Sequence, residues 1–211
     1  GRSSQSGSTA GPTARGVFNG MRASAEAAFG RSDLAGLRVA VQGVGGVGSE
    51  LARLLVEAGA EVTVADVDAD AVAALAHRLP SVSVVTPDEI LAADVDVVSP
   101  NAIGGVLDKT TIPTIRATVV CGSANNQLAT SDDGASMTER GILWAPDYVV
   151  SAGGAIAGTC EVGAITETER DARLEAIYHT TLSVLEQATT EGVSSDLVAQ
   201  RMAREILDSE G

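Results

Sequence analysis

The chain is 211 residues long, 45% hydrophobic and only 2% aromatic, so its core must be built from Ala, Val, Leu and Ile, as is typical of a parallel sheet buried on both faces. A formal net charge of −14 repels phosphate backbones and anionic lipids, which argues against nucleic-acid and membrane partners. The sequence has no apolar run long enough to span a bilayer and no pattern of a secretory leader. Cys121 and Cys160 have no metal-site or CxxC spacing, so we expect free buried thiols and a cytoplasmic setting.

The first segment has little to bury, and a helix follows it. Residues 1–11 are mostly Ser, Gly, Thr and Gln, a composition typical of a flexible lead or a severed linker. Over residues 12–29 apolar side chains recur at helical spacing, which predicts a helix, and Gly30 is placed to end it.

The following segments alternate between strand and helix patterns. Short apolar runs at 38–43 and 61–66 flank a Gly-rich turn and a helix that ends near 58–59, which makes a complete βαβ unit. The pattern then predicts a helix near 70–78, a strand near 81–85, a short helix near 87–92, and strands near 96–99, 118–121 and 142–144.

This alternation predicts the fold class. Strands that alternate with helices require right-handed crossovers and a parallel sheet, so we expect an α/β fold, a doubly wound Rossmann sheet. After residue 154 the pattern is helical, with stretches at 166–188 and 194–207 that we expect to pack back on the sheet, as does the N-terminal helix. The prediction is one Rossmann domain over 12–211, with its core at about 37–150 and a helical return at 151–211.

The segment Gly43-Val-Gly-Gly-Val-Gly48 matches the G-x-G-x-x-G pattern and lies between a strand and a helix. In that context Gly43 allows a tight turn, Gly45 lets the backbone approach a pyrophosphate, and Gly48 permits close packing of helix on strand. The helix dipole favours an anion at this position. The amides expected to face the anion belong to Gly46 and Val47.

An acidic residue ends the second strand of the same unit. Asp66 lies 23 residues after Gly43, where a carboxylate can accept hydrogen bonds from the adenosine ribose hydroxyls and would repel a 2′-phosphate. The segment that follows, Val67 to Asp70, adds two more acids and no Arg. We therefore expect the domain to bind NAD rather than NADP, with Val67 beside the cofactor.

Three further loops, at 99–105, 122–127 and 151–154, follow the carboxyl ends of later strands, where doubly wound folds bind their ligands. Their small and amide residues suit a nicotinamide riboside, and Asn101 and Asn126 are the preferred candidates. The alternative is that these are turns rich in Gly, Asn and Pro for backbone reasons.

Several blocks occur in a fixed order: Val41-Gln-Gly-Val-Gly-Gly-Val-Gly48, Pro100-Asn-Ala102, Gly122-Ser-Ala-Asn-Asn-Gln127, Ala145-Pro-Asp-Tyr148 and Ala152-Gly-Gly154. Together they resemble the C-terminal domain of the Glu/Leu/Phe/Val amino-acid dehydrogenases, most closely the leucine, valine and phenylalanine branch. The likeness covers nearly everything from Thr13 onward. The family usually has Asn where Ser151 stands and often Cys where Asn101 stands.

The resemblance implies oxidative deamination of an L-amino acid, branched-chain or aromatic, to a 2-oxo acid and ammonia, with hydride transfer to NAD. Asn126 would also reach the substrate, and the small residues Ala155 and Gly158 would leave a roomy pocket for its side chain. The residues that the resemblance places at the nicotinamide end are Thr13, Asn101, Ala102, Ala124 and Asn126.

The family carries two active-site lysines and a catalytic aspartate in an N-terminal domain that has no counterpart here. One lysine fixes the substrate carboxylate, and the other, with a depressed pKa, activates water. Lys109 is the only lysine of the chain and cannot fill both roles, while His77 and His179 have no triad or metal cluster around them. We expect no catalytic residue and no metal site in the chain, which should bind cofactor without turnover.

Three interpretations stay open. The chain is the cofactor domain of a dehydrogenase whose small-molecule amino-acid substrate is handled by the missing catalytic domain, or a non-catalytic NAD-binding sensor or partner subunit. The third is a dehydrogenase of another substrate class whose second chain supplies the chemistry. A monomer and a homo-oligomer are both compatible with the sequence.

Overall fold

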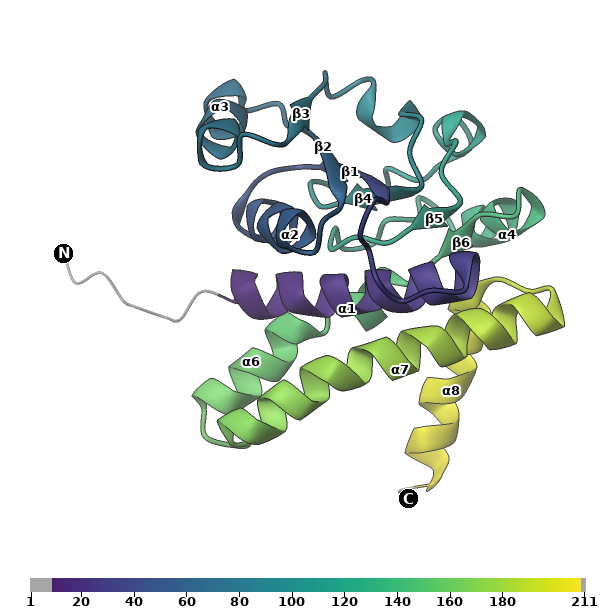
Figure 1. Cartoon of the computed structure of the whole chain (residues 1–211). Coiled ribbons are helices and arrows are strands. Elements are labelled where there is room, and N and C mark those ends of the chain that lie inside the picture. The colour runs from purple at the N-terminus through teal and green to yellow at the C-terminus, as the bar shows by residue number, and fades with distance from the viewer. Residues whose placement is uncertain (1–8, 210–211) are drawn as a thin grey trace.

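The structure, a computed structural model, describes residues 9–209 and consists of a parallel sheet covered by helices (Figure 1). The strands are β1 (Arg38–Gln42), β2 (Glu61–Ala65), β3 (Ser83–Val84), β4 (Val97–Pro100), β5 (Val119–Val120) and β6 (Leu143–Trp144). The α-helices are α1 (Ala10–Phe29), α2 (Gly46–Glu57), α3 (Ala69–Arg78), α4 (Asp132–Glu139), α5 (Asp147–Val150), α6 (Gly153–Glu161), α7 (Glu167–Glu191) and α8 (Ser195–Ser209). Two short 3-10 helices are η1 (Ile90–Ala92) and η2 (Ile112–Thr114).

The strand order is β3-β2-β1-β4-β5-β6, and every pairing is parallel. In the middle of the sheet Val39 of β1 lies opposite Val62 of β2 on one side and Val97 of β4 on the other. The chain runs outward from β1 to β3, crosses back to β4 and then runs outward in the other direction, which is the doubly wound Rossmann arrangement. The predicted fold class is confirmed.

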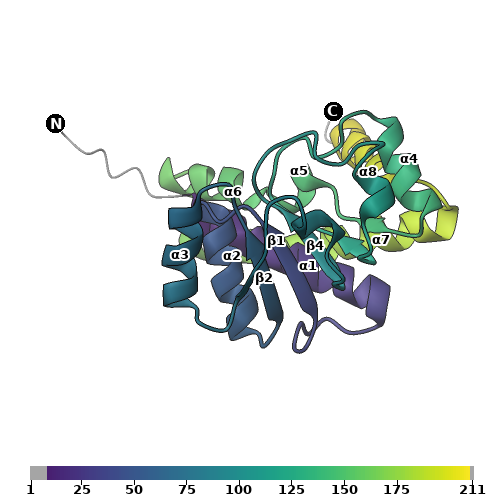
Figure 2. The ribbon, with the colours of Figure 1, turned by 90° about the horizontal axis from the view of Figure 1, so that it is seen from above.

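Helical and irregular segments cover the two faces of this sheet. One face packs on α1 and α2, and the other packs on the segment from η1 through α4. Because side chains alternate along a strand, Val39 and Val41 join the first core and Ala40 joins the second. Helix α1 lies between the sheet and the long helix α7, which adds a second helical layer on that side (Figures 1 and 2).

Close packing of α1 depends on glycine. A Cβ on Gly16 would lie 2.6 Å from the carbonyl oxygen of Val150, and a Cβ on Gly20 would lie 2.3 Å from Val150 Cγ1. Val17 and Met21 on the same helix are fully buried. The N-terminal helix therefore packs back on the sheet and on the C-terminal helices, as the sequence predicts.

Several elements differ from the expectation. Helix α1 begins at Ala10 rather than at residue 12, and residues 1–8 of the expected flexible lead lie outside the described residues. The helix expected near 87–92 is a single 3-10 turn. Helix α4 was not predicted, because the polar run Ser131-Asp-Asp-Gly134 at its start is typical of a turn.

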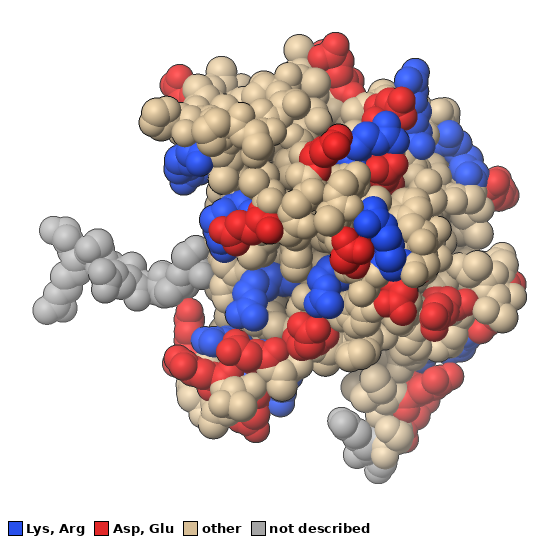
Figure 3. Space-filling model, viewed as in Figure 1, with Lys and Arg blue, Asp and Glu red and all other residues tan. Residues whose placement is uncertain are grey.

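The surface of α1 and α7 carries interspersed charges of both signs (Figure 3). Arg22 pairs with Glu175 at 3.2 Å, and Arg15 lies 3.8 Å from Asp171, so these pairs join the two helices. Exposed ion pairs contribute at most about 1 kcal/mol each, so apolar burial contributes more to this contact. No helix within residues 9–209 has the length and apolarity needed to cross a membrane.

Candidate functional site

Most of the predicted site residues follow the carboxyl ends of neighbouring strands. Gly43 follows β1, Asp66 follows β2 and Asn101 follows β4, while Ala124 and Asn126 lie in the loop after β5. Parallel strands have their carboxyl ends at one edge of the sheet, so the structure brings these residues to the same edge. In doubly wound folds, ligands bind at this edge, where the strand order reverses.

The turn between β1 and α2 needs its glycines for different reasons. Gly43 has a φ of 89°, in the left-handed region that favours glycine. A Cβ on Gly48 would lie 1.9 Å from the carbonyl oxygen of Gly43, so no side chain fits there. A Cβ on Gly45 would have no heavy atom within 4 Å, which leaves the open backbone that a pyrophosphate requires.

Helix α2 begins inside this turn. Its first amides have no intrahelical acceptor, and the N-cap residue Gly45 has no side chain to accept from them. Gly46 is exposed and Val47 is half-buried. Because helix N-terminal amides and the helix dipole attract anions, the amides of Gly46 and Val47 can bind phosphate oxygens.

Asp66 joins the end of β2 to the same turn. Its Oδ2 accepts a hydrogen bond from the Val44 amide at 2.7 Å, and its Oδ1 accepts one from the Asp68 amide at 3.0 Å. The half-buried carboxylate thus lies directly beside the glycine turn, where a ribose would follow a bound pyrophosphate. Val67, which follows it, is 90% exposed.

Asn101 links two neighbouring loops. Its Nδ2 donates to the Ser99 carbonyl oxygen at 2.8 Å and to Ser99 Oγ at 3.0 Å. Its Oδ1 accepts from the Ser123 amide at 2.9 Å and from Ser123 Oγ at 2.7 Å. The Asn101 side chain therefore positions the loops, whereas the adjacent Ala102 is exposed and lies against Gly43.

The loop after β5 places its two predicted site residues differently. Ala124 is only 5% exposed, and its amide donates to the Pro100 carbonyl oxygen at 3.0 Å. Asn126 is exposed and has a φ of 53°, the one non-glycine residue with a positive φ among residues 9–209. Asn126 is therefore accessible to a ligand, and Ala124 offers little surface.

Two buried residues that the sequence did not single out hold this loop. Gln127 donates from Nε2 to the Gly122 carbonyl oxygen at 2.7 Å and accepts from Trp144 Nε1 at 3.0 Å. Asp147, only 6% exposed, accepts the Asn126 amide on Oδ2 at 2.9 Å. Burial raises the pKa of the Asp147 carboxyl, although the accepted amide hydrogen bonds oppose the rise. In the sequence, only membership of the blocks 122–127 and 145–148 pointed to these residues.

The start of α1 reaches the glycine turn. A Cβ on Gly46 would lie 3.3 Å from Ala10 Cβ, and a Cβ on Gly154 of α6 would lie 2.8 Å from Thr13 Oγ1. Thr13 is thus about one helical turn from the contact with Gly46. The two residues predicted to meet the substrate side chain also lie on α6: Ala155, which is exposed, and Gly158, on which a Cβ would meet no atom within 4 Å.

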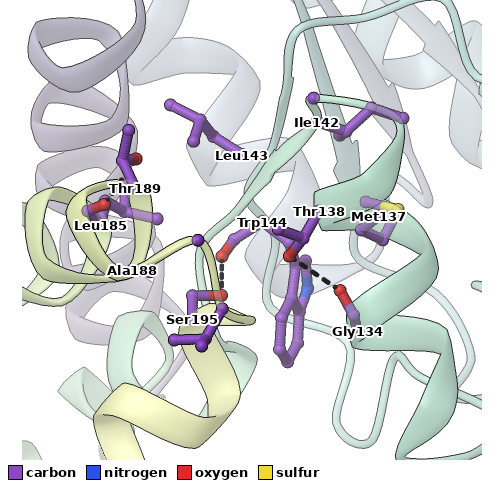
Figure 4. A pocket seen from close by; sticks show the side chains of 13 residues that line it. Gly134, Met137, Thr138, Ile142, Leu143, Trp144, Leu185, Ala188, Thr189 and Ser195 are labelled. Atoms are coloured by element: carbon purple, nitrogen blue, oxygen red, sulfur yellow. Dashed lines mark hydrogen bonds between the residues drawn. The ribbon is translucent and has the colours of Figure 1, made fainter.

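An apolar cavity of about 320 Å³ lies elsewhere, between the β6–α4 region and the α7–α8 helices (Figure 4). Met137 and Trp144 line this cavity. Two of the hydroxyl groups in its lining already donate to backbone: Thr138 Oγ1 to the Gly134 carbonyl oxygen at 3.1 Å, and Ser195 Oγ to the Trp144 carbonyl oxygen at 2.5 Å. Since this cavity offers no charged side chain for a phosphate, the glycine turn is the better candidate site.

The sheet order and the glycine turn define a Rossmann-type α/β domain. The family model for glutamate/leucine/phenylalanine/valine dehydrogenases matches residues 66–207. Valine dehydrogenase of Streptomyces virginiae is 42% identical over 195 residues, which cover 92% of this chain and 54% of that protein. The chain belongs to the Glu/Leu/Phe/Val dehydrogenase family, a family of NAD(P)-dependent oxidoreductases.

Two further relatives match nearly the whole of this chain as well. Leucine dehydrogenase of Bacillus cereus is 38% identical over 204 residues, which cover 97% of this chain and 56% of that protein. The crystal structure of L-tryptophan dehydrogenase from Nostoc punctiforme superimposes with a TM-score of 0.90 at 37% identity, over 95% of this chain and 60% of that one. The chain thus spans little more than half the length of the relatives it matches.

Proposed function

We propose that the chain is the NAD(H)-binding half of an amino-acid dehydrogenase and that it does not turn over substrate by itself. The observation that carries this proposal is the pairing of open backbone at Gly45 with the Asp66 carboxylate, which is tied to the same turn through Val44 at 2.7 Å. One end of this arrangement suits a pyrophosphate and the other suits a ribose diol.

The residues present fit NAD along its whole length. The amides of Gly46 and Val47 would hold the pyrophosphate, and Asp66 would hold the adenosine ribose, with the exposed Val67 next to it in the chain. When bound, NAD accepts the hydride from the substrate. Its nicotinamide end would meet Thr13, Ala102 and Asn126, while Asn101 holds the neighbouring loops in place and Ala124 offers little surface.

The charges beside the ribose favour NAD over NADP. Asp66, Asp68 and Asp70 follow one another within five positions, and no Arg or Lys stands between Asp66 and Asp70. These carboxylates would repel a 2′-phosphate on the adenosine ribose, and no cationic side chain of this segment would offset the repulsion.

The substrate class we propose is an L-amino acid with a branched-chain or aromatic side chain. The relatives described above are named for valine, leucine and tryptophan. On α6, Ala155 and Gly158 carry little or no side chain beside open space, which suits a large apolar group, and Asn126 is exposed near the nicotinamide end.

The chemistry of deamination requires more than this chain supplies. Lys109 is its only lysine and is exposed in the loop before η2, and residues 9–209 hold no cluster of three metal-ligating side chains. We infer that the substrate carboxylate and the attacking water are handled by a catalytic domain outside these 211 residues.

Titration of NADH and of NADPH into the chain, followed by nucleotide fluorescence, tests the cofactor proposal. We expect saturable NADH binding and at least tenfold weaker NADPH binding, since placing like charges against one another costs about 1.4 kcal/mol or more, and 1.4 kcal/mol is tenfold in affinity. Equal affinity for both nucleotides would contradict the proposed role of Asp66, and binding of neither would contradict the proposed function.

A further inference from the structure

The turn at Asn126 is conformationally costly. A φ of 53° is unusual for a residue with a side chain, although Asn tolerates it better than most. The turn is also closely packed, because a Cβ on Gly104 would lie 2.4 Å from the Asn125 carbonyl oxygen. The Asn126 carbonyl oxygen accepts the Gly105 amide at 2.7 Å. The conformation of Asn126 therefore also sets the position of the loop that follows β4.

The Asp147 carboxylate offsets the conformational cost at Asn126 by accepting a backbone hydrogen bond there. Its Oδ2 accepts the Asn126 amide at 2.9 Å, and the Gln127 amide also acts on the same carboxylate. Asp147 is 6% exposed. Among residues 9–209, no Arg, Lys or His acts on its carboxylate, and the one further charge that does is the negative Asp196. A carboxylate without a counter-charge is costly to bury, so its main compensation is the set of amide hydrogen bonds it accepts.

The same segment of chain holds the loop at a second point. Trp144, three residues before Asp147, donates from Nε1 to Gln127 Oε1, and Gln127 donates onward to the Gly122 carbonyl oxygen. Gly122 in turn packs against Pro100, whose carbonyl oxygen would lie 2.2 Å from a Cβ there. The residues from Trp144 to Asp147 thus fix both ends of the loop 122–127.

We propose that Asp147 is a positioning residue for the cofactor and substrate site: its buried carboxylate holds the backbone at Asn126 in the left-handed conformation and so sets where the Asn126 side chain stands. This inference rests on the proposed function, since it takes Asn126 to contact the nicotinamide end and the substrate. It assigns Asp147 no contact with either ligand.

Asp147→Asn tests the proposal, with Asp133→Asn as a matched control. Asp133 is 7% exposed and accepts the Thr130 amide at 2.7 Å, so the control removes a similarly buried, amide-bonded charge from the first turn of α4, outside the proposed site. Hydrogen exchange of the peptide that covers 122–128 reports the turn directly. NADH titration reports the site.

We expect Asp147→Asn to speed exchange in 122–128 and to weaken NADH binding about tenfold, because asparagine offers one acceptor oxygen where the carboxylate offers two and because its hydrogen bond to the Asn126 amide is no longer charge-assisted. Asp133→Asn should change neither, even if both variants lower the melting temperature equally. A double variant shows whether Asp147 acts through the Asn126 side chain or only by loosening the fold. Its second substitution is Asn126→Gly, because glycine adopts a positive φ without strain and has no side chain to position. In the Asn126→Gly background Asp147→Asn should weaken NADH binding no more than about twofold, because non-additivity marks residues that act through one another.

Equal effects of Asp147→Asn on NADH binding with and without the Asn126 side chain would overturn the proposal, as would equal effects of the two Asp→Asn variants. If the unmodified chain does not bind NADH, the proposed function fails. The exchange measurement then decides separately whether Asp147 holds the turn, and unchanged exchange in Asp147→Asn would overturn that part as well.

Discussion

Asp66 accepts the amide of Val44 at 2.7 Å, so the end of β2 is bonded to the middle of the glycine turn after β1. Val44 stands between Gly43, which needs its positive φ, and Gly45, beside which a Cβ would find open space. The carboxylate therefore stabilises the turn, and under the proposed function it is also the acceptor for the adenosine ribose. Both functions depend on one side chain.

Substitution of Asp66 should separate these two roles. Asp66→Asn keeps an oxygen that can accept the Val44 amide but removes the charge, so we expect nearly unchanged stability and a smaller preference for NADH over NADPH. Asp66→Ala removes both and should also weaken NADH binding about tenfold or more. Fluorescence titration with both nucleotides measures this, and an unchanged NADH/NADPH ratio in both variants would contradict the assignment.

Two glycine substitutions should have opposite consequences. Gly48→Ala places a Cβ 1.9 Å from the Gly43 carbonyl oxygen, which must displace α2 or the turn and should destabilise the fold by about 1–3 kcal/mol. Gly45→Ala meets no atom within 4 Å, so stability should hold while the methyl group obstructs the proposed pyrophosphate site and weakens NADH binding.

Thermal unfolding and NADH titration of both glycine variants check this pair. If Gly45→Ala bound NADH as well as the unmodified chain, the pyrophosphate would have to lie elsewhere.

The sequence predicted the features that depend on local pattern. The G-x-G-x-x-G turn, Asp66 at the end of a strand and the helix ended by Gly30 all follow from residue type and spacing, and the structure places each of them as expected. Strand lengths were overestimated: β3, β5 and β6 pair over two residues each, because pairing depends on neighbours that the apolar pattern does not reveal.

Contacts between distant segments were not predictable in this way. Asp147 accepts the amide of Asn126, 21 positions earlier, and nothing in the composition of either segment indicates that pairing. The side-chain amide of Asn101 donates from Nδ2 to Ser99 and accepts on Oδ1 from Ser123, so a residue expected to face a ligand joins two loops. The expectation of two buried thiols holds only for Cys121, since Cys160 is half-buried.

The two cysteines should differ in reactivity. Burial raises the pKa of the Cys121 thiol to about 12, and only the thiolate reacts with alkylating reagents, while Cys160 is partly exposed on α6. We expect iodoacetamide at pH 8 to modify Cys160 in the folded chain and Cys121 only after unfolding. Peptide mass spectrometry locates the modification, and Cys160→Ser supplies the control. Rapid labelling of Cys121 in folded protein would contradict the buried position.

Asp96 should make stability depend on pH in the acidic range. Its Oδ1 accepts Arg38 Nη2 at 2.8 Å and its Oδ2 accepts the Arg38 amide at 2.8 Å, and the bond to the guanidinium lowers the pKa of the Asp96 carboxyl. A carboxyl whose pKa is lower in the folded state contributes stability above its unfolded pKa, about 3.9, and loses it as the pH falls through the folded value.

Asp96→Asn tests this contribution. At pH 7 the variant should be less stable by about 1 kcal/mol, a value kept small because the pair is partly exposed. The difference from the unmodified chain should shrink when denaturant unfolding is repeated at pH 3. A difference that is the same at both pH values would show that the ionised carboxylate is not what stabilises the start of β1.

The most direct test of the central claim is isothermal titration calorimetry of NADH into the chain, with Asp66→Ala in parallel and with NAD-dependent oxidation of valine, leucine, phenylalanine and tryptophan assayed on the same samples. We predict saturable binding, weaker binding in Asp66→Ala, and no oxidation of any of the four amino acids. Turnover by the chain alone would contradict the claim that the catalytic groups lie outside it, and absence of binding would contradict its assignment as the cofactor half.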